Sequence, residues 1–587
     1  MSQTTNETDH AMLVLWGMFA HCIGLIQEIE EVPLSQKTVT HSPQSKVLEF
    51  LVAMLSGHKY LKDISQSARP LDKDMAVAQA WGQKAWADHS GVSRTLGQLS
   101  ESEVEQISRV LEQVSQPFID QEVHQALADG SLILDGDLTP REVSNGSKSY
   151  PGAEYGHMSD RLQLGYQAAI VSLKSPTYGR IGLSAQQHSG KTVSATQAEA
   201  LALEAERCMG RRPLRRTDLL AERLQQLQAK EEPLLQKIGD AEQRLLAAQT
   251  AQVEVAELLQ QAQQNLVVQQ TVYAESQREE HPHSKLAKTR KKVSIYEQRL
   301  ARREKAVNKA VQQLERQKSH FDDWKNSLET LQRRLQRFET ENAANPAPIE
   351  ATFRLDAGFG TPENLALLIE MGYEVYSKPY GTWLSGILAK KSANQTNWEK
   401  VGKNAVMQAW KAQQLEDFPY PLDLGYERFW IGNGYRFSGL LHFGKQEVTA
   451  DLPAWFHQYN ARQLIEAGNK EARQVFEVHH LKVRSRPALR LQEHFALFTA
   501  NFVRFASEWL AEQCPQIPNG WKNTAQPNVK EQVKVGAHAP ALVEWIGQDC
   551  LLRFGDRSIY AGRSFLVRRQ FAIQLALPWN CSLFEAF

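Results

Sequence analysis

Two long stretches in the middle of the chain carry apolar residues at alternating steps of three and four positions. The first covers residues 220–266, with Glu231 and Gln252 as polar exceptions, and the second covers residues 293–338. Such a heptad pattern predicts two long helices that pack along one apolar seam. A His-Pro-His-Ser segment at 281–284 separates them, and its proline breaks the helix. We therefore expect an antiparallel coiled-coil hairpin, with arms of roughly 80–90 Å at about 1.5 Å per residue.

Prolines also mark the limits of this hairpin. Pro233 predicts either a kink in the first arm or the true start of its helix. The Asn-Pro-Ala-Pro segment at 345–348 predicts a helix stop and a linker.

Before the hairpin, the pattern changes from helical to strand-like. Residues 1–125 repeat apolar positions at helical spacing, as in 47–65 and 76–99, which predicts short helices joined by turns. Basic residues and His near these turns suit DNA binding, and a helical packing domain is the alternative. The apolar run 11–25 follows acidic residues and is too short to span a bilayer, so we expect a core helix and no membrane segment.

Strand signals appear on both sides of the hairpin. Three short runs before it, at 132–134, 166–173 and 180–187, predict consecutive strands with hairpin connections, and a helix follows at 196–208. After it, residues 351–378 predict a strand, a helix and a strand. The remaining segments are a β-rich stretch at 381–455, a helical stretch at 456–513, and a tail with short strands at 521–587.

Composition narrows the class of protein only a little. The chain has 587 residues and zero formal net charge, so we expect about three to five domains and no global basic field. Its five cysteines are scattered without a CxxC pair, which argues against a zinc ribbon or a disulfide framework. This cysteine usage fits a reducing cytosol.

Three acidic segments carry the candidate chemistry. Asp135 and Asp137 end the first strand-like run, Asp356 ends the strand after the hairpin, and Glu466 lies in the late helical stretch. Carboxylate oxygens are the ligands that Mg²⁺ prefers, and two such ions can clamp both oxygens of a phosphoryl transfer. Asp135 and Asp137 lie two residues apart on a strand, so both side chains face the same side.

The order of elements, without the hairpin and the β-rich stretch, is that of an RNase H-like fold. Together with these carboxylates, the chain resembles the DDE transposases of bacterial insertion sequences, in the cut-and-paste subgroup with the signature Tyr-x2-Arg-x3-Glu-x6-Lys. Tyr459, Arg462 and Glu466 match that signature, whereas its last position is Arg473, with Lys470 as a substitute one turn earlier. The family has its first Asp just before Ser or Thr, which favours Asp137, followed by Leu138 and Thr139, over Asp135.

The resemblance implies a metal-dependent DNA transposase. Asp137, Asp356 and Glu466 would be the catalytic residues and would hold two Mg²⁺ or Mn²⁺ ions. Tyr459, Arg462, Lys470 and Arg473 would bind DNA. The partners would be double-stranded transposon ends and target DNA, in a homodimer or larger paired-end complex, and the location would be the bacterial cytoplasm. The long hairpin departs from the family, and the resemblance gives it no role.

The expected fold is therefore an α/β RNase H-like core, a mixed sheet flanked by helices, with accessory parts. These parts are a helical DNA-binding domain at 1–125, core segments at 126–210, 347–380 and 456–515, the coiled-coil insertion at 211–346, the β-rich insertion at 381–455, and a C-terminal accessory region at 516–587. Two alternatives stay open: an RNase H-like nuclease without strand transfer, and a catalytically inactive coiled-coil protein that bridges DNA.

Neighbouring residues have competing interpretations. His479 and His480 suggest a metal site, but adjacent histidines on a helix point apart, which favours packing or surface roles. Trp455 and Phe456 suit either stacking on a flipped base or, preferentially, core packing. The basic residues between Lys482 and Arg490 suit either a solvated loop or contacts with phosphate.

Overall fold

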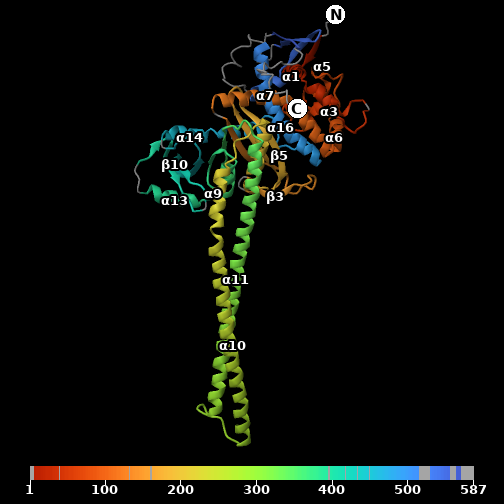
Figure 1. Cartoon of the computed structure of the whole chain (residues 1–587). Helices are drawn as coiled ribbons and strands as arrows, with labels where there is room; N and C mark the ends of the chain where they lie inside the picture. Colours follow the sequence, from red (N-terminus) through yellow and green to blue (C-terminus); the bar gives the residue numbers. More distant parts are fainter. Residues whose placement is uncertain are drawn as a thin grey trace. The chain divides into compact units, whose positions relative to one another are not determined.

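The computed structural model describes residues 5–38, 40–130, 132–158, 161–393, 397–416, 418–432, 434–448, 450–513, 529–555 and 564–569. The chain is mixed α/β and forms two compact units (Figure 1). One unit consists of the segment Arg215–Ala344. The other is built from the parts of the chain before and after that segment.

The Arg215–Ala344 unit is a pair of long helices. One arm contains α9 (Thr217–Gln228) and α10 (Glu231–Glu275), and the other is α11 (Lys285–Ala343). Pro233 lies in the first turn of α10, where no intrahelical hydrogen bond is lost. Of the two outcomes expected for this proline, the structure therefore shows a helix start. Ser284 begins the second arm, because its hydroxyl accepts a hydrogen bond of 3.1 Å from the amide of Ala287.

The predicted apolar seam holds the two arms together. Leu259 and Ala262 of α10 form a buried cluster with Val293 of α11. Near the chain ends of the unit, the buried guanidinium of Arg215 lies 2.6 Å from the carboxylate of Glu341. The helix pair thus has its own apolar and polar contacts along its length.

The other unit contains a ten-stranded mixed sheet. Its strands are β2 (Ile133–Glu142), β3 (Glu154–Met158), β4 (Arg161–Ser175), β5 (Gly179–Ser189), β6 (Thr352–Arg354), β7 (Glu374–Ser377), β8 (Glu399–Lys400), β9 (Ala405–Gln413), β10 (Leu422–Ile431) and β11 (Gly434–Phe443). Five of them run side by side in the order β5-β4-β2-β6-β7. β2, β6 and β7 are parallel, whereas β4 is antiparallel to both β2 and β5.

The β-rich stretch continues this sheet. β11 pairs antiparallel with β7, and β10, β9 and β8 follow outward in that order. A helix, α13 (Trp383–Ser392), contacts β10 and β11. The stretch that the sequence suggested as an insertion is therefore hydrogen-bonded directly to the central strands.

Helices cover both faces of the central strands. α8 (Ala198–Met209) contacts β2, β4 and β5, and Leu201 of α8 lies beside Gly136 of β2. On the opposite face, Ile465 of α15 (Gln463–Gln474) and Leu497 of α16 (Arg486–Gln513) pack on Ile170 of β4. Two further helices, α12 (Pro362–Glu370) and α14 (Leu452–Asn460), lie between β6 and α15 in the chain.

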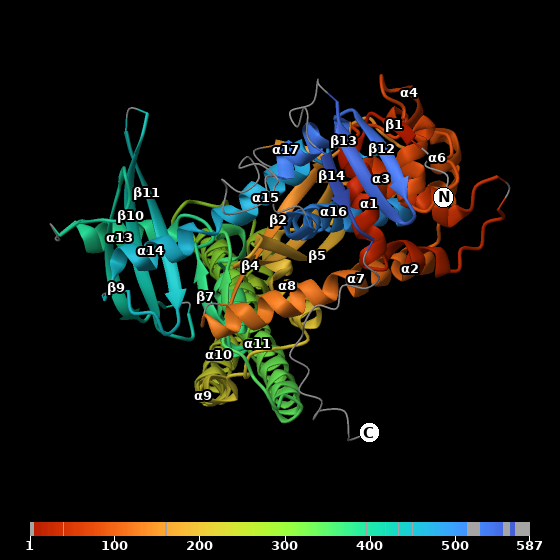
Figure 2. The same ribbon diagram turned by 90° about the horizontal axis from the view of Figure 1, so that it is seen from above.

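The N-terminal region is mostly helical, with one strand that the sequence analysis missed. Its helices are α1 (Ala11–Cys22), α2 (Leu25–Glu31), α3 (Pro43–Leu55), α4 (Asp63–Gln66), α5 (Met75–Ala80), α6 (His89–Gln98) and α7 (Glu101–Ala128). The strand β1 (Thr5–Thr8) joins a second sheet of order β1-β12-β13-β14, with β12 (Ala541–Ile546), β13 (Asp549–Phe554) and β14 (Ser564–Val567). In Figure 2, β12, β13 and β14 lie in front of α1, which contacts β13, and the short helix α17 (Val529–Lys534) lies beside them.

In the part of the chain that is described, no single helix has both the length and the apolar composition needed to cross a membrane. By length and composition alone, α1 and α2 would do so together, but they meet at an angle of 71°. Almost every residue of α1 is buried, as expected for the core helix predicted at 11–25.

Candidate active site

Asp137 and Asp356 lie at the same level on two neighbouring parallel strands. In the ladder between β2 and β6, Ile133 is opposite Thr352 and Asp135 is opposite Arg354. Continuing this register by two residues places Asp137 beside Asp356, just beyond the last residue of β6. Two residues far apart in the sequence, one before and one after the long helix pair, therefore meet where β6 ends beside the middle of β2.

Asp135, the alternative first carboxylate, is already engaged by the fold. It is 1% exposed, and both of its oxygens accept hydrogen bonds of 2.7 Å from the guanidinium of Arg354. Arg354 also donates a hydrogen bond of 2.6 Å to the carbonyl oxygen of Gln458 in α14. A bidentate buried pair of this kind fixes geometry and leaves Asp135 little capacity for another ligand.

The third carboxylate, Glu466, reaches the same place from α15. Arg462 connects it to the strand carboxylates, because its Nη2 lies 2.5 Å from Oε1 of Glu466 and its Nη1 lies 3.9 Å from Oδ1 of Asp137. Glu466 is the most exposed of the group, with 56% of its side chain accessible. This carboxylate can therefore rotate between Arg462 and another partner.

The carboxylates influence one another's protonation. Burial, followed by repulsion from Asp356 and Glu466, raises the pKa of Asp137 to about 6, although Arg462 opposes the shift. Burial and Glu466 also raise the pKa of Asp356, against Arg462 and the Gly358 amide. Repelling carboxylates around a single guanidinium form a site that gains stability from added positive charge.

One donor in this site lacks a hydrogen bond within the described chain, although it lies 3.9 Å from a carboxylate oxygen of Asp137. Nη1 of Arg462 is buried and makes no hydrogen bond there. Burial of an unpaired guanidinium N–H costs about 1–3 kcal/mol or more, so such groups mark strained or functional positions. An anion placed beside Asp137 would satisfy it.

Buried ion pairs hold α15 in position under the sheet. Glu471 of α15 accepts two hydrogen bonds, of 2.8 and 2.9 Å, from Arg504 of α16, and Arg180 of β5 lies 3.4 Å away. Arg180 also donates a hydrogen bond of 2.8 Å to the carbonyl oxygen of Leu464. Gly468 makes this approach possible, because an added Cβ would lie 1.3 Å from Nη1 of Arg180.

The remaining residues of the predicted signature differ in accessibility. Tyr459 is 7% exposed, and its hydroxyl donates a hydrogen bond of 3.3 Å to the carbonyl oxygen of Leu355. It therefore supports the strand that leads to Asp356 and does not present a surface for DNA. Lys470 and Arg473 are exposed on α15, four and seven residues after Glu466, which places them on the same helix face.

Two residues that sequence reasoning missed complete the surroundings of the aspartates. Arg354 binds Asp135, and the side-chain amide of Asn469 in α15 donates a hydrogen bond to Oδ2 of Asp137. Asn469 lies three residues after Glu466 and therefore on the same helix face, and this spacing was the sequence signal that could have identified it. Arg354 had no local signal, since only strand pairing brings it to Asp135.

Burial and hydrogen bonds decide between the alternative roles of Trp455, Phe456 and Lys482. Trp455 and Phe456 are 0% and 6% exposed in a cluster with Tyr376 and Leu452, so they pack in the core and do not present a face to a base. Lys482 donates hydrogen bonds to the carbonyl oxygens of Phe476 and Glu477, which makes it part of the fold and not a free phosphate contact.

The expectation that His479 and His480 lie on a helix is wrong. α15 ends at Gln474, and both histidines lie in the turn after it. Their ring centroids are 3.9 Å apart, so the side chains lie together and do not point apart.

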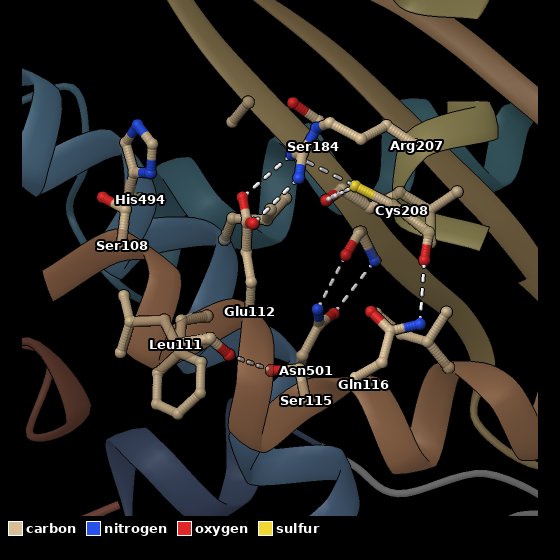
Figure 3. Close-up of a pocket in the computed structure, with 16 residues that line it drawn as sticks. Ser108, Leu111, Glu112, Ser115, Gln116, Ser184, Arg207, Cys208, His494 and Asn501 are labelled. Carbon is tan, nitrogen blue, oxygen red and sulfur yellow. Dashed lines mark hydrogen bonds and ion pairs between the residues drawn. The ribbon is translucent and has the colours of Figure 1, made fainter. Parts of the chain in front are cut away.

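A separate pocket lies between α7, α8, α16 and β5 (Figure 3). Two of its polar side chains are firmly bound to protein groups: Asn501 exchanges two hydrogen bonds with the Gly182 backbone, and Arg207 forms a two-pronged pair with Glu112. Burial raises the pKa of the Cys208 thiol to about 12, so this cysteine is not a nucleophile. The pocket contains none of the predicted site residues.

No protein family model matches this chain, and no curated protein sequence matches it either.

Proposed function

We propose that this chain is a DDE transposase with an RNase H-like core. The observation that carries the proposal is the register that sets Asp137 beside Asp356, with Glu466 facing them from α15. The strand order supports it as well. If β2, β4, β5, β6 and β7 are numbered one to five along the chain, their order across the sheet is three, two, one, four, five. Among these five strands, only strand two, which is β4, is antiparallel to strand one, which is β2. That is the order of the RNase H-like sheet.

The donor set fits hard divalent cations. It consists of three carboxylates, which repel one another enough to raise the pKa values of both aspartates. Two Mg²⁺ or Mn²⁺ ions held by Asp137, Asp356 and Glu466 would activate the attacking oxygen of water or a 3′-hydroxyl and stabilise the leaving oxygen. For Glu466 to take part, its carboxylate must leave Arg462.

Once Glu466 has turned away, Arg462 is available to bind the phosphate of the substrate. When Glu466 turns away, the guanidinium keeps its place beside Asp137 and offers Nη1 and Nη2 to a phosphate oxygen of the scissile strand. Lys470 and Arg473, exposed on the face of α15 that carries Glu466, contact the flanking backbone phosphates. Tyr459 positions the end of β6 through Leu355.

Incubation of the full-length protein with plasmid DNA that carries the sequences flanking its own gene, with Mg²⁺, tests this function. We expect site-specific cleavage by the wild type and at least a thousandfold loss in Asp137→Asn, Asp356→Asn and Glu466→Gln. Glu363→Gln, an exposed change on α12, is the matched control and should cut normally. Gel shifts on the same DNA should be unchanged by all four substitutions.

A strand-transfer assay separates this function from its two alternatives. Joining of cut ends to a second plasmid supports a transposase, and cleavage without joining shows a nuclease. DNA binding with no cleavage in Mg²⁺ or Mn²⁺ would show the inactive bridging protein and would overturn the proposal.

A further inference from the structure

The turn after α15 brings together a carboxylate and two imidazoles away from the aspartate pair. Glu477, His479 and His480 each place one possible ligand atom so that the three atoms lie within 4.8 Å of one another. Nε2 of His479 and Nε2 of His480 are both 3.8 Å from Oε2 of Glu477. Two ligands on a tetrahedral Zn²⁺, bound at about 2.0–2.1 Å, are about 3.4 Å apart. The two distances from an imidazole nitrogen to the carboxylate oxygen therefore need to contract by only about 0.4 Å to match this spacing.

The hydrogen bonds around the cluster leave the three facing atoms available. Nδ1 of His479 donates to the carbonyl oxygen of Arg473 at 2.9 Å, so in the neutral ring Nε2 carries the lone pair. A backbone carbonyl on the outer nitrogen is the usual support of a metal-binding histidine. Oε1 of Glu477 accepts a hydrogen bond of 3.0 Å from Lys534, which leaves Oε2 directed at the imidazoles.

The backbone is strained at the carboxylate. Glu477 has φ of 54°, in the left-handed region that costs a residue other than glycine about 1 kcal/mol or more. Two lysines bind this residue: Lys482 donates to its carbonyl oxygen and Lys534 to Oε1. Neither is hydrogen-bonded to Oε2.

We propose that Glu477, His479 and His480 form a binding site for one divalent transition-metal ion of the zinc class. Two imidazoles and one carboxylate suit Zn²⁺ with a fourth position open to solvent or an external ligand, and they suit Mg²⁺ poorly. The site is distinct from the Asp137, Asp356 and Glu466 group and does not depend on the function proposed for it.

The surroundings indicate what this ion does. Glu477 is tied to α17 through Lys534, and the ring of His480 lies 5.4 Å from that of Tyr60, in the N-terminal region between α3 and α4. A metal at this turn fastens the end of the Glu466 helix to two other parts of the fold. It acts as a structural clip, and Zn²⁺ raises the melting temperature.

Calorimetric titration of chelator-treated full-length protein with Zn²⁺ tests the site. We expect one ion at this cluster, and its affinity should fall at least tenfold in each of His479→Ala, His480→Ala and Glu477→Gln. A His281→Ala/His283→Ala variant, altered in the connection between α10 and α11, is the matched control and keeps wild-type affinity. Asp356→Asn also keeps it, which separates this result from any failure of the transposase proposal.

Co²⁺ added to the wild type gives a readout that does not depend on the variants folding. Visible absorption typical of four- or five-coordinate Co²⁺, displaced by one equivalent of Zn²⁺, supports the site. Absence of micromolar Zn²⁺ binding to the wild type, or equal binding by wild type and His479→Ala, overturns it.

Discussion

Asp135 and Arg354 face each other across two parallel strands and form a buried two-pronged ion pair, with both N–O distances at 2.7 Å. Asp137, two residues further along the same strand face, has no such arginine partner. It faces Asp356, Glu466 and a guanidinium that two carboxylates share. The two aspartates therefore have opposite energetic roles, although they are neighbours in sequence.

Asparagine substitutions should separate these roles in a stability measurement. Asp135→Asn leaves the Arg354 charge buried without a carboxylate, so we expect a loss of about 3–5 kcal/mol in the free energy of unfolding. Asp137→Asn removes a repelled carboxylate and should not destabilise the protein at pH 8. Urea unfolding of both variants in metal-free buffer decides the point. A smaller loss for Asp135→Asn than for Asp137→Asn would contradict the assignment.

The effect of Asp137→Asn should depend on pH in a defined direction. The pKa of Asp137 is raised to about 6 in the folded protein, above its ordinary value, so the folded state binds this proton more tightly. Ionisation therefore costs stability above pH 6, and the cost falls as the pH drops from 6 toward 4. We expect the variant to exceed the wild type by at most about 3 kcal/mol at pH 8, with the gap closing near pH 4. A gap that grows toward low pH would show the opposite sign.

Glu471→Gln should loosen the helix that carries Glu466. The change leaves Arg180 and Arg504 buried with less compensation, and we expect a loss of about 2–4 kcal/mol. Glu447→Gln, which breaks the exposed pair with Lys411, is the control and should cost less than about 1 kcal/mol. Thermal melts of both variants give the comparison. Equal shifts of the two melting temperatures would show that Glu471 does not hold α15 in position.

Removal of the long helix pair should leave the rest of the chain folded. Outside the pair, the side-chain amide of Asn345 donates a hydrogen bond of 3.1 Å to the carbonyl oxygen of Arg212, and Pro213 bridges to Ile349. These contacts keep the two chain ends together, so a short Gly/Ser linker can replace residues 217–343. We expect a single cooperative melt.

Under the transposase proposal, the same deletion variant should keep weak binding to the transposon ends but lose paired-end assembly. Light scattering with and without DNA measures this. A melt without cooperativity would show that the helix pair is part of the core, and wild-type assembly would exclude a bridging role.

Local sequence patterns were sufficient to predict the elements that are determined by interactions between residues close in the sequence. The heptad seam predicted both long helices, and the proline signals marked the break between them at Pro282 and the helix start near Pro233. The position of Asp356 just after β6 also followed from a short apolar run, whereas the expectation that the first strand ends at Asp137 is wrong, because β2 continues to Glu142. The placement of Asp137 beside Asp356 depends on the parallel register between β2 and β6, which the sequence pattern alone does not specify.

Features that depend on distant partners were missed. Arg354 appeared to be an ordinary strand residue, because its partner Asp135 lies on the far side of the helix pair in the sequence. β1 was overlooked, since Thr5–Thr8 is polar and becomes a strand only by pairing with β12. The sequence pattern predicts helix through Glu477, because left-handed backbone at a glutamate has no residue signal.

The pairing of β1 with β12 also has a consequence for how the chain is made. Thr8 lies opposite Ala541, so about 530 residues must be synthesised before the first strand meets its neighbour. At about 5–20 residues per second, that takes roughly half a minute to two minutes. Until then β1 lacks its neighbouring strand, so the sheet that contains β1 and β12 closes only after the segment around Ala541 has been made.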